Sequence, residues 1–259
     1  MTPQSDLERG RAVLGSARKV LFLTGAGVST DSGIPDFRGP KGLWTRDPDA
    51  EKLSDIRFYM ASRAIRVKAW RQRCMQLRSN IAPNAGHRAI AAFEQTGRML
   101  ALITQNVDGL HAMAGSSTGK TIEIHETIRR VRCMQCDRVI PMDEVLARIE
   151  AGEEDPPCLS CRGILKSDTI SFGQALRPDA IERSLRLAST CDCIVAIGTT
   201  LQVYPVASIV PLAVDAGAAL ILVNAEATPM DDLARVVIRD PISASLPRLL
   251  QTPLEFGNA

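Results

Sequence analysis

Near its N-terminus the chain reads Lys19-Val20-Leu21-Phe22-Leu23-Thr24-Gly25-Ala26-Gly27, an apolar run that ends in a glycine-rich turn. The apolar part is continuous rather than alternating, which is typical of a strand buried on both faces of a parallel sheet. Four similar runs follow, at Met99–Ile103, Thr121–Ile124, Cys193–Ile197 and Ala219–Val223. Stretches with helical spacing separate most of them, at Pro83–Gln95, Pro178–Ser189 and Pro205–Ala216. Strands that alternate with helices predict an α/β fold with an open parallel sheet.

Each predicted strand is followed by residues that can bind a polar ligand. These strand ends read Gly25-Ala26-Gly27, Gln105-Asn106-Val107-Asp108, His125, Gly198-Thr199-Thr200 and Asn224-Ala225-Glu226. In open parallel sheets, ligands bind in the crevice outside the carboxyl ends of the strands. We therefore expect one composite site at this edge of the sheet.

Taken singly, these motifs leave alternatives open. The amides of Gly25-Ala26-Gly27 suit a pyrophosphate or a plain strand-to-helix turn, and a dehydrogenase would have a third glycine where Thr30 stands. Asn224 and Glu226 can hold a pair of ribose hydroxyls, but polar residues after a strand are common. His125 suits a general base because an imidazole titrates near neutrality, whereas a lone histidine at a strand end is more often structural.

Four of the seven cysteines form two Cys-x-x-Cys pairs with the spacing of a zinc ribbon: Cys133, Cys136, Cys158 and Cys161. Four thiolates close the tetrahedron around a zinc ion and leave no position for a substrate. We therefore expect one structural zinc ion rather than four free thiols. The pairs lie in residues 127–164, and residues 40–81 are rich in Arg and Lys. Both segments break the strand–helix rhythm, so we expect them to form a second, smaller domain.

Composition excludes several classes of protein. The chain has 259 residues, a formal charge of +2 and 4% aromatic residues, which argues against a nucleic-acid partner, including a zinc-ribbon binder of nucleic acid. The apolar runs are too short to cross a bilayer. No basic leader followed by an apolar stretch and a small-residue cleavage site opens the chain, so we expect a cytoplasmic protein.

The strand-end motifs, taken in order, resemble the sequence signature of the sirtuins. The similarity starts at Gly25–Ser29, Ser32–Arg38 and Gly42–Trp44, and continues through Thr104–His111 and Glu123–His125. It includes the two cysteine pairs, Gly198–Leu201 and Asn224–Glu226, so it spans roughly Lys19 to Leu249. The resemblance implies a Rossmann-like domain of residues 1–39, 82–126 and 165–259, with residues 40–81 and 127–164 as its helical and zinc modules. It also implies that NAD is a co-substrate and that the partners are acylated-lysine proteins or peptides.

The resemblance also implies roles for individual residues. It assigns the catalytic roles to His125, Asn106 and Asp108, and the recognition of the substrate peptide to Phe172, Gly173 and Val203. The residues that it places around NAD are Gly25, Ala26, Gly27, Ser29, Asp36, Phe37, Arg38, Trp44, Gln105, Asn106, Val107, Asp108, Gly198, Thr199, Thr200, Asn224, Ala225, Glu226 and Ile242. In the implied reaction, the acyl oxygen of a modified lysine attacks the nicotinamide ribose and nicotinamide leaves. His125 then deprotonates a ribose hydroxyl, and the products are free lysine and an O-acyl-ADP-ribose.

The chain departs from the family pattern at a few positions. Glu126 stands where a glycine usually follows the catalytic histidine, and Gln174 stands where the usual Phe-Gly-Glu has glutamate. A Tyr-x-x-Arg pair, which marks acidic acyl groups in some sirtuins, is absent between Met60 and Arg78, so we expect neutral acyl groups to be preferred over succinyl. A mono-ADP-ribosyltransferase or an NAD glycohydrolase on the same fold is the alternative activity.

Overall fold

A computed structural model describes residues 4–36, 39, 42 and 50–251 of the chain. Its larger sheet has six parallel strands in the order β3-β2-β1-β7-β8-β9. The strands are β1 (Val20–Thr24), β2 (Met99–Thr104), β3 (Thr121–Glu123), β7 (Cys193–Ile197), β8 (Ala219–Val223) and β9 (Val236–Ile238). The predicted α/β fold with an open parallel sheet is therefore confirmed. β9, a three-residue strand at the edge of the sheet, is too short to stand out as an apolar run and was not expected from the sequence.

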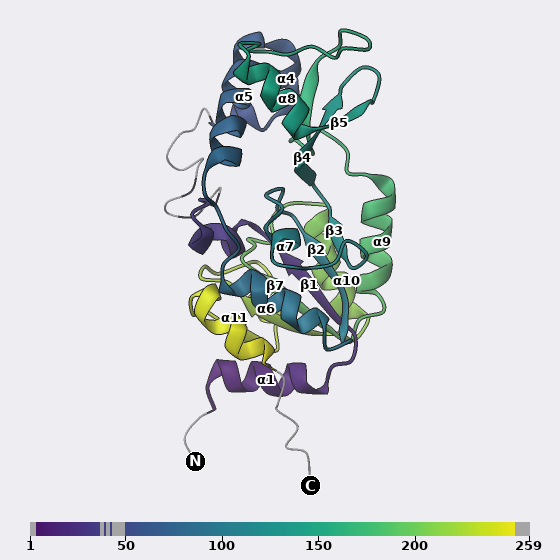
Figure 1. Cartoon of the computed structure of the whole chain (residues 1–259). Helices are drawn as coiled ribbons and strands as arrows, with labels where there is room; N and C mark the ends of the chain where they lie inside the picture. Colours follow the sequence, from purple (N-terminus) through teal and green to yellow (C-terminus); the bar gives the residue numbers. More distant parts are fainter. Residues whose placement is uncertain (1–3, 37–38, 40–41, 43–49, 252–259) are drawn as a thin grey trace.

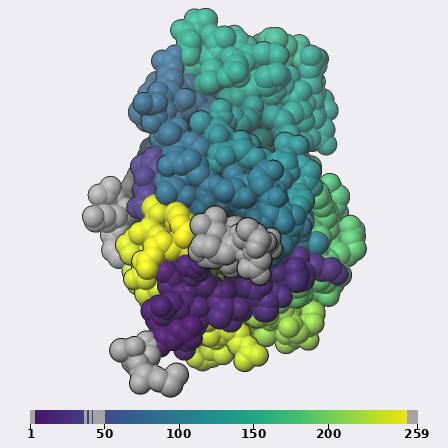
Figure 2. Space-filling view, turned by 60° about the horizontal axis from the view of Figure 1, so that its bottom comes forward, coloured from purple at the N-terminus to yellow at the C-terminus, as the bar shows by residue number. Residues whose placement is uncertain are grey.

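Two layers of helices cover this sheet because its apolar residues point to both faces. Val20 and Phe22 pack on one face against α1 (Asp6–Ser16), α6 (Ala85–Glu94) and α11 (Ile242–Leu250). Leu21 and Leu23 pack on the other face against α9 (Pro178–Ala188) and α10 (Ile209–Asp215). Figure 1 shows the sheet between these layers. In Figure 2, α1 and α11 lie side by side at the end of the molecule opposite the smaller module.

Short helical segments connect these elements. They are the 3-10 helices η1 (Ala26–Ser32), η2 (Val206–Ser208) and η3 (Asp231–Leu233), and the one-turn helix α7 (Leu110–Met113). Among the helices of the described residues, none combines the length and apolar character needed to cross a lipid bilayer.

In its described residues, the smaller module combines a sheet and four helices. Its antiparallel sheet has the order β5-β4-β6, from β4 (Glu126–Cys133), β5 (Val139–Pro141) and β6 (Leu165–Thr169). Its helices are α3 (Ala50–Leu53), α4 (Ile56–Ala61), α5 (Arg63–Arg78) and α8 (Met142–Glu150). Trp70 of α5 packs in one core with Val131, Val145 and Leu165, which joins the helical segment to the zinc segment.

The boundary of the second segment differs from the expectation. We expected the chain to return to the larger sheet at residue 165, but Leu165–Thr169 pairs with β4 as strand β6. The run Leu165-Lys166-Ser167-Asp168-Thr169 has no apolar pattern of its own, so its pairing partner determines its structure. We therefore place the return to the larger sheet after Thr169.

Candidate active site

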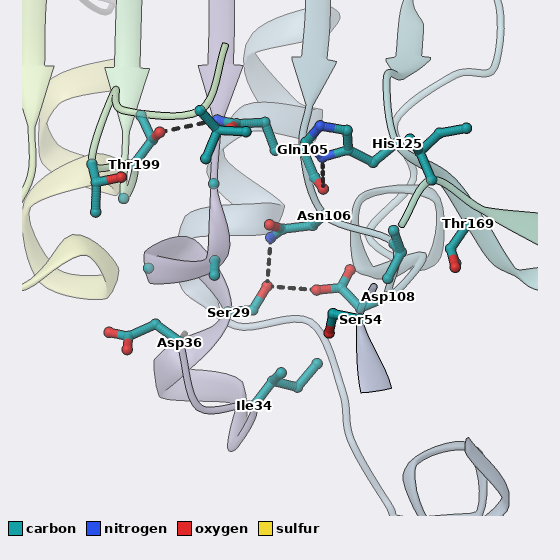
Figure 3. Close-up of a pocket in the computed structure, with 18 of the residues that line it drawn as sticks. Ser29, Ile34, Asp36, Ser54, Gln105, Asn106, Asp108, His125, Thr169 and Thr199 are labelled. Atoms are coloured by element: carbon teal, nitrogen blue, oxygen red, sulfur yellow. Dashed lines mark hydrogen bonds between the residues drawn. The ribbon is translucent and has the colours of Figure 1, made fainter. Parts of the chain in front are cut away.

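A cleft of about 1420 Å³ lies where the carboxyl ends of the large sheet face the smaller module. Almost all of the residues expected to bind NAD or peptide line it, although they come from distant parts of the chain (Figure 3). They are Gly25, Ala26, Gly27, Ser29, Asp36, Gln105, Asn106, Val107, Asp108, His125, Phe172, Gly173, Gly198, Thr199, Thr200, Val203, Asn224, Ala225, Glu226 and Ile242. Phe37, Arg38 and Trp44 lie outside the described residues.

Two glycine-rich turns form the floor of the cleft by backbone contact. The N–H of Gly27 donates to the carbonyl oxygen of Gly198 at 2.8 Å. A Cβ on Gly27 would lie 2.7 Å from the Cα of Gly198, and one on Gly198 would lie 2.4 Å from the nitrogen of Val28. Gly198 also has a φ of +58°, which favours glycine. These two turns can approach each other, and a phosphate group, only because both positions lack a side chain.

Ser29 is the centre of a buried polar network. Its hydroxyl donates to Oδ2 of Asp108 at 2.8 Å and accepts from Nδ2 of Asn106 at 3.1 Å. Nε2 of His87 lies 3.4 Å from the same oxygen, and Nδ1 of His87 accepts from the N–H of Asn84 at 3.3 Å. All five residues are buried. The network therefore fixes Asn106 and Asp108, which face the cleft in Figure 3.

His87 lies in the first turn of α6, which Asn84 caps, and this role of the histidine was not expected from the sequence. Burial lowers the pKa of His87 and keeps the ring neutral, although the charge of Asp108 opposes the shift. The link to Ser29 spans two elements that are far apart in the sequence, so no local motif reveals it.

His125 is held in one tautomer by the chain that follows β2. Its Nδ1 lies 2.9 Å from the carbonyl oxygen of Gln105. Since a carbonyl only accepts hydrogen bonds, Nδ1 carries the proton and Nε2 is the basic nitrogen. Burial lowers the pKa of His125 below its usual value of 6.5, so the ring is neutral at pH 7. Nε2 is thus able to accept a proton from a group in the cleft.

Gln105 connects His125 to a neighbouring strand. Its side-chain Nε2 donates to the hydroxyl of Thr199 at 3.0 Å, and its backbone N–H donates to the carbonyl of Thr24 at 2.9 Å. The ends of β1, β2, β3 and β7 are thereby linked by hydrogen bonds through Gln105.

One edge of the predicted peptide groove is already hydrogen-bonded to the smaller module. The N–H of Phe172 donates to the carbonyl of Ser54 at 2.8 Å, and the N–H of Ile56 donates to the carbonyl of Phe172 at 3.0 Å. The side chain of Phe172 is 40% exposed. Val203 lines the same cleft from the segment after β7.

Two arginines of α5, Arg71 and Arg73, lie in different places. Arg71 is exposed and pairs with Glu154 at 2.6 Å. Arg73 lines the cleft, and its Nε is buried without a hydrogen-bond partner among the described residues. Lys166 lines the cleft as well and is 3% exposed; burial, and then the charge of Arg73, lower its pKa to about 7.

The four paired cysteines form one cluster, with all of their Sγ atoms within 4.8 Å of one another. The Sγ atoms of Cys133 and Cys161 are 3.4 Å apart, and those of Cys136 and Cys158 are 3.8 Å apart. Four sulfurs bound to zinc at about 2.3 Å lie about 3.8 Å from one another, so the cluster fits one zinc ion. The N–H groups of Cys161 and Ser160 lower the pKa of Cys158 to about 6, which favours the thiolate.

Comparisons with known proteins agree with this geometry. The sequence profile of the Sir2 family matches residues 25–205. An NAD-dependent protein deacetylase 2 from Streptomyces coelicolor is 51% identical over 232 residues, which cover 90% of this chain and 96% of that protein. The chain belongs to the Sir2 family.

Other relatives support the same assignment of this Sir2 protein. An NAD-dependent protein deacetylase from Sulfolobus acidocaldarius is 41% identical over 92% of this chain and 91% of its own length. A solved Sir2 enzyme structure has a TM-score of 0.85 and 32% identity, over 95% of this chain and 96% of that one. A Sir2 structure described as holding a p53 peptide and NAD+ has a TM-score of 0.80 and 31% identity, over 92% and 95% of the two chains.

Proposed function

We propose that this chain is an NAD-dependent protein lysine deacylase that removes acetyl or other neutral acyl groups and releases nicotinamide and an O-acyl-ADP-ribose. The orientation of His125 carries the proposal. Its Nδ1 proton is held by Gln105, burial keeps the ring neutral, and Nε2 remains a free base in a cleft lined by polar strand ends. A Sir2 relative named as an NAD-dependent protein deacetylase, and Sir2 structures with NAD+ or a propionylated peptide, support it.

In this proposal, the floor of the cleft binds the phosphates of NAD. The N–H groups of Ala26, Thr199 and Thr200 are the donors that these turns offer, because those of Gly25, Gly27 and Gly198 donate to carbonyl oxygens of the protein. Asn224, Glu226 and Ile242 line the same cleft. Gln105 and Asn106 orient the ribose, and Asp108 accepts from the carboxamide of nicotinamide. NAD, when bound, supplies the ribose carbon to which the acyl oxygen is transferred. His125 takes a proton from a ribose hydroxyl at Nε2.

The segment after β6 and the loop after β7 hold the acylated peptide. Gly173 offers one backbone edge, beside Phe172, whose own N–H and carbonyl are bonded to the smaller module. Val203 offers the other edge, so that main-chain hydrogen bonds bind the peptide without strict sequence choice. The four cysteines hold one zinc ion, which stabilises the smaller module and takes no part in the chemistry because its coordination is complete.

Incubation of the zinc-loaded protein with NAD and an acetyl-lysine peptide, followed by mass spectrometry, tests the proposal. We expect nicotinamide, free peptide and O-acetyl-ADP-ribose in equal amounts. His125→Ala should lower turnover by about 10²–10⁴-fold with zinc content and melting temperature unchanged. Nicotinamide released without free peptide would indicate an NAD glycohydrolase instead, and ADP-ribose attached to a protein would indicate a transferase.

We also propose that the protein acts in the cytoplasm. The reducing conditions there keep thiols free to bind zinc, whereas an oxidising compartment favours disulfides. Cell fractionation followed by immunodetection tests this location, and recovery of the protein outside the cytoplasmic fraction would contradict it.

A further inference from the structure

The chain passes from the large sheet to the smaller module directly after His125. It leaves at His125–Glu126 and comes back at Thr169–Ile170. The two crossings are bonded to each other, since the N–H of Ile170 donates to the carbonyl of His125 at 2.9 Å and Glu126 pairs with Thr169. His125 is therefore the last residue before the chain crosses from the larger sheet to the smaller module. The two bonded crossings are called the hinge below.

Glu126 adopts a backbone conformation that a side chain disfavours. Its φ is +62°, in the left-handed region, where a Cβ lies too close to the neighbouring carbonyl oxygen. A residue other than glycine remains in this region only when its surroundings hold it there. The contacts of the Glu126 side chain must therefore compensate for the backbone.

The carboxylate of Glu126 joins the two modules. Its Oε2 lies 2.8 Å from Nη2 of Arg130 on β4, and its Oε1 lies 3.5 Å from Nε of Arg177. Arg177 precedes α9, which packs on the large sheet. The Glu126 side chain is only 16% exposed, so solvent screens these ion pairs less than it screens pairs on the open surface.

A second buried carboxylate strengthens the same link. Asp168 of β6 is 3% exposed and lies 2.8 Å from Arg132, 3.2 Å from Arg130 and 3.7 Å from Arg177. Arg177 thus reaches both strands that cross the hinge. Its ion-pair partners lie on β4 and β6 of the smaller module, whereas Arg177 itself lies just before α9, which packs on the larger sheet.

We propose that Glu126 is a positioning residue for the reaction, because its carboxylate, anchored by Arg177, fixes the His125 backbone and so aims Nε2 at the group that it deprotonates. Arg177 is the residue beside the larger sheet with which Glu126 forms this ion pair. The proposal rests on the proposed function, in which His125 acts after nicotinamide has left. A displaced base should slow that later step and leave nicotinamide release unchanged, because errors of about 1 Å in the position of a reacting group are enough to cost up to 10²-fold in rate.

Single-turnover experiments with NAD and an acetyl-lysine peptide separate the two steps. In Glu126→Gln and in Arg177→Gln, we expect nicotinamide to form within about twofold of the wild-type rate and free peptide to form roughly tenfold more slowly. Arg177→Lys keeps the charge and should restore most of the rate. Glu126→Gly, which removes the carboxylate but suits the left-handed backbone, should be as slow as Glu126→Gln and guards against a folding defect.

Two matched variants control for the loss of a surface charge. Glu153→Gln removes a carboxylate that pairs with Arg148 within the smaller module, and Arg186→Gln removes an exposed arginine of α9. Both should behave like the wild type. Any of three results would overturn the proposal. Arg177→Gln or Glu126→Gly could form free peptide at the wild-type rate, or the formation of nicotinamide and of free peptide could slow equally. In the third, Arg177→Lys would not recover the rate of peptide formation. A wild-type protein that forms no free peptide would instead refute the deacylase function.

Discussion

Nδ1 of His125 lies 2.9 Å from the carbonyl oxygen of Gln105, so the segment after β2 determines which nitrogen of the histidine after β3 is basic. The contact needs no charged partner. A carboxylate at this position would raise the pKa of the imidazole, whereas a carbonyl orients the ring and leaves burial as the larger effect on its pKa.

The first prediction concerns the acidic limb of the pH–rate profile. Burial lowers the pKa of His125, and the base must be neutral to act, so kcat/KM should rise with pH and level off with a midpoint below 6.5. Initial rates of deacetylation between pH 5 and 8, at temperatures where the protein stays folded, measure this midpoint. A midpoint above 6.5 would show that the imidazole is stabilised in its charged form.

The second prediction concerns stability in acid. His111 lies with its ring centroid 4.8 Å from that of His87, and burial, with a smaller contribution from His87, lowers its pKa to about 3. The unfolded chain binds a proton near pH 6.5 and the folded chain does not, so the free energy of unfolding falls as the pH drops from 6.5 toward 3. The loss from this residue amounts to about 2 kcal/mol by pH 5. Urea denaturation at pH 7 and pH 5 should show a smaller difference in His111→Gln than in the wild type.

The third prediction concerns the zinc cluster. Cys133 and Cys158 are the two buried ligands, so Cys133→Ala or Cys158→Ala should reduce zinc below one ion per chain and lower the melting temperature. Cys74→Ala, a cysteine outside the cluster, is the control and should keep its zinc. Zinc analysis and thermal denaturation measure both effects. A variant that loses zinc but melts like the wild type would contradict a structural role.

The fourth prediction concerns the acyl group. Acetyl-lysine should be a better substrate than succinyl-lysine, and Arg73 is, besides Lys166, a basic residue of the cleft that a succinyl carboxylate could meet. Arg73→Met should therefore lower kcat/KM for succinyl-lysine about tenfold more than for acetyl-lysine, the equivalent of one charge-assisted hydrogen bond. Arg71→Met is the matched control, since Arg71 pairs with Glu154 on the surface, and it should change neither value. Equal losses for both substrates would show that Arg73 only supports the fold.

Sequence patterns predicted the larger sheet because its strands are apolar without interruption. Val20–Leu23 are fully buried, and a short continuous apolar run of this kind is typical of a strand that is covered on both faces. The strand ends then determined which residues share the cleft. By contrast, β6 carries two buried polar side chains, Lys166 with hydrogen bonds to backbone carbonyls and Asp168 with ion pairs to arginines, so no hydrophobic pattern marks the strand.

The contacts around Ser29 and Glu126 were beyond the reach of the sequence. Ser29, Asn84 and Asp108 come from three separate segments, and their hydrogen bonds exist only after the sheet has formed. Glu126 was recognised as a departure from the family pattern, but its φ of +62° and its contact with Arg177 depend on how the two modules meet. Pairings over such distances are set by topology, which residue spacing does not encode.

The contact between Gly27 and Gly198 also bears on how this protein can change during evolution. Each glycine meets backbone atoms of the other turn rather than a side chain, so no substitution elsewhere creates space for a larger residue at either position. A larger residue at one of these two positions cannot be accommodated by a substitution at the other. The two turns should therefore be inherited as a unit, and variants of this protein that reach new substrates should carry their changes elsewhere in the cleft, for example at Phe172 or Val203.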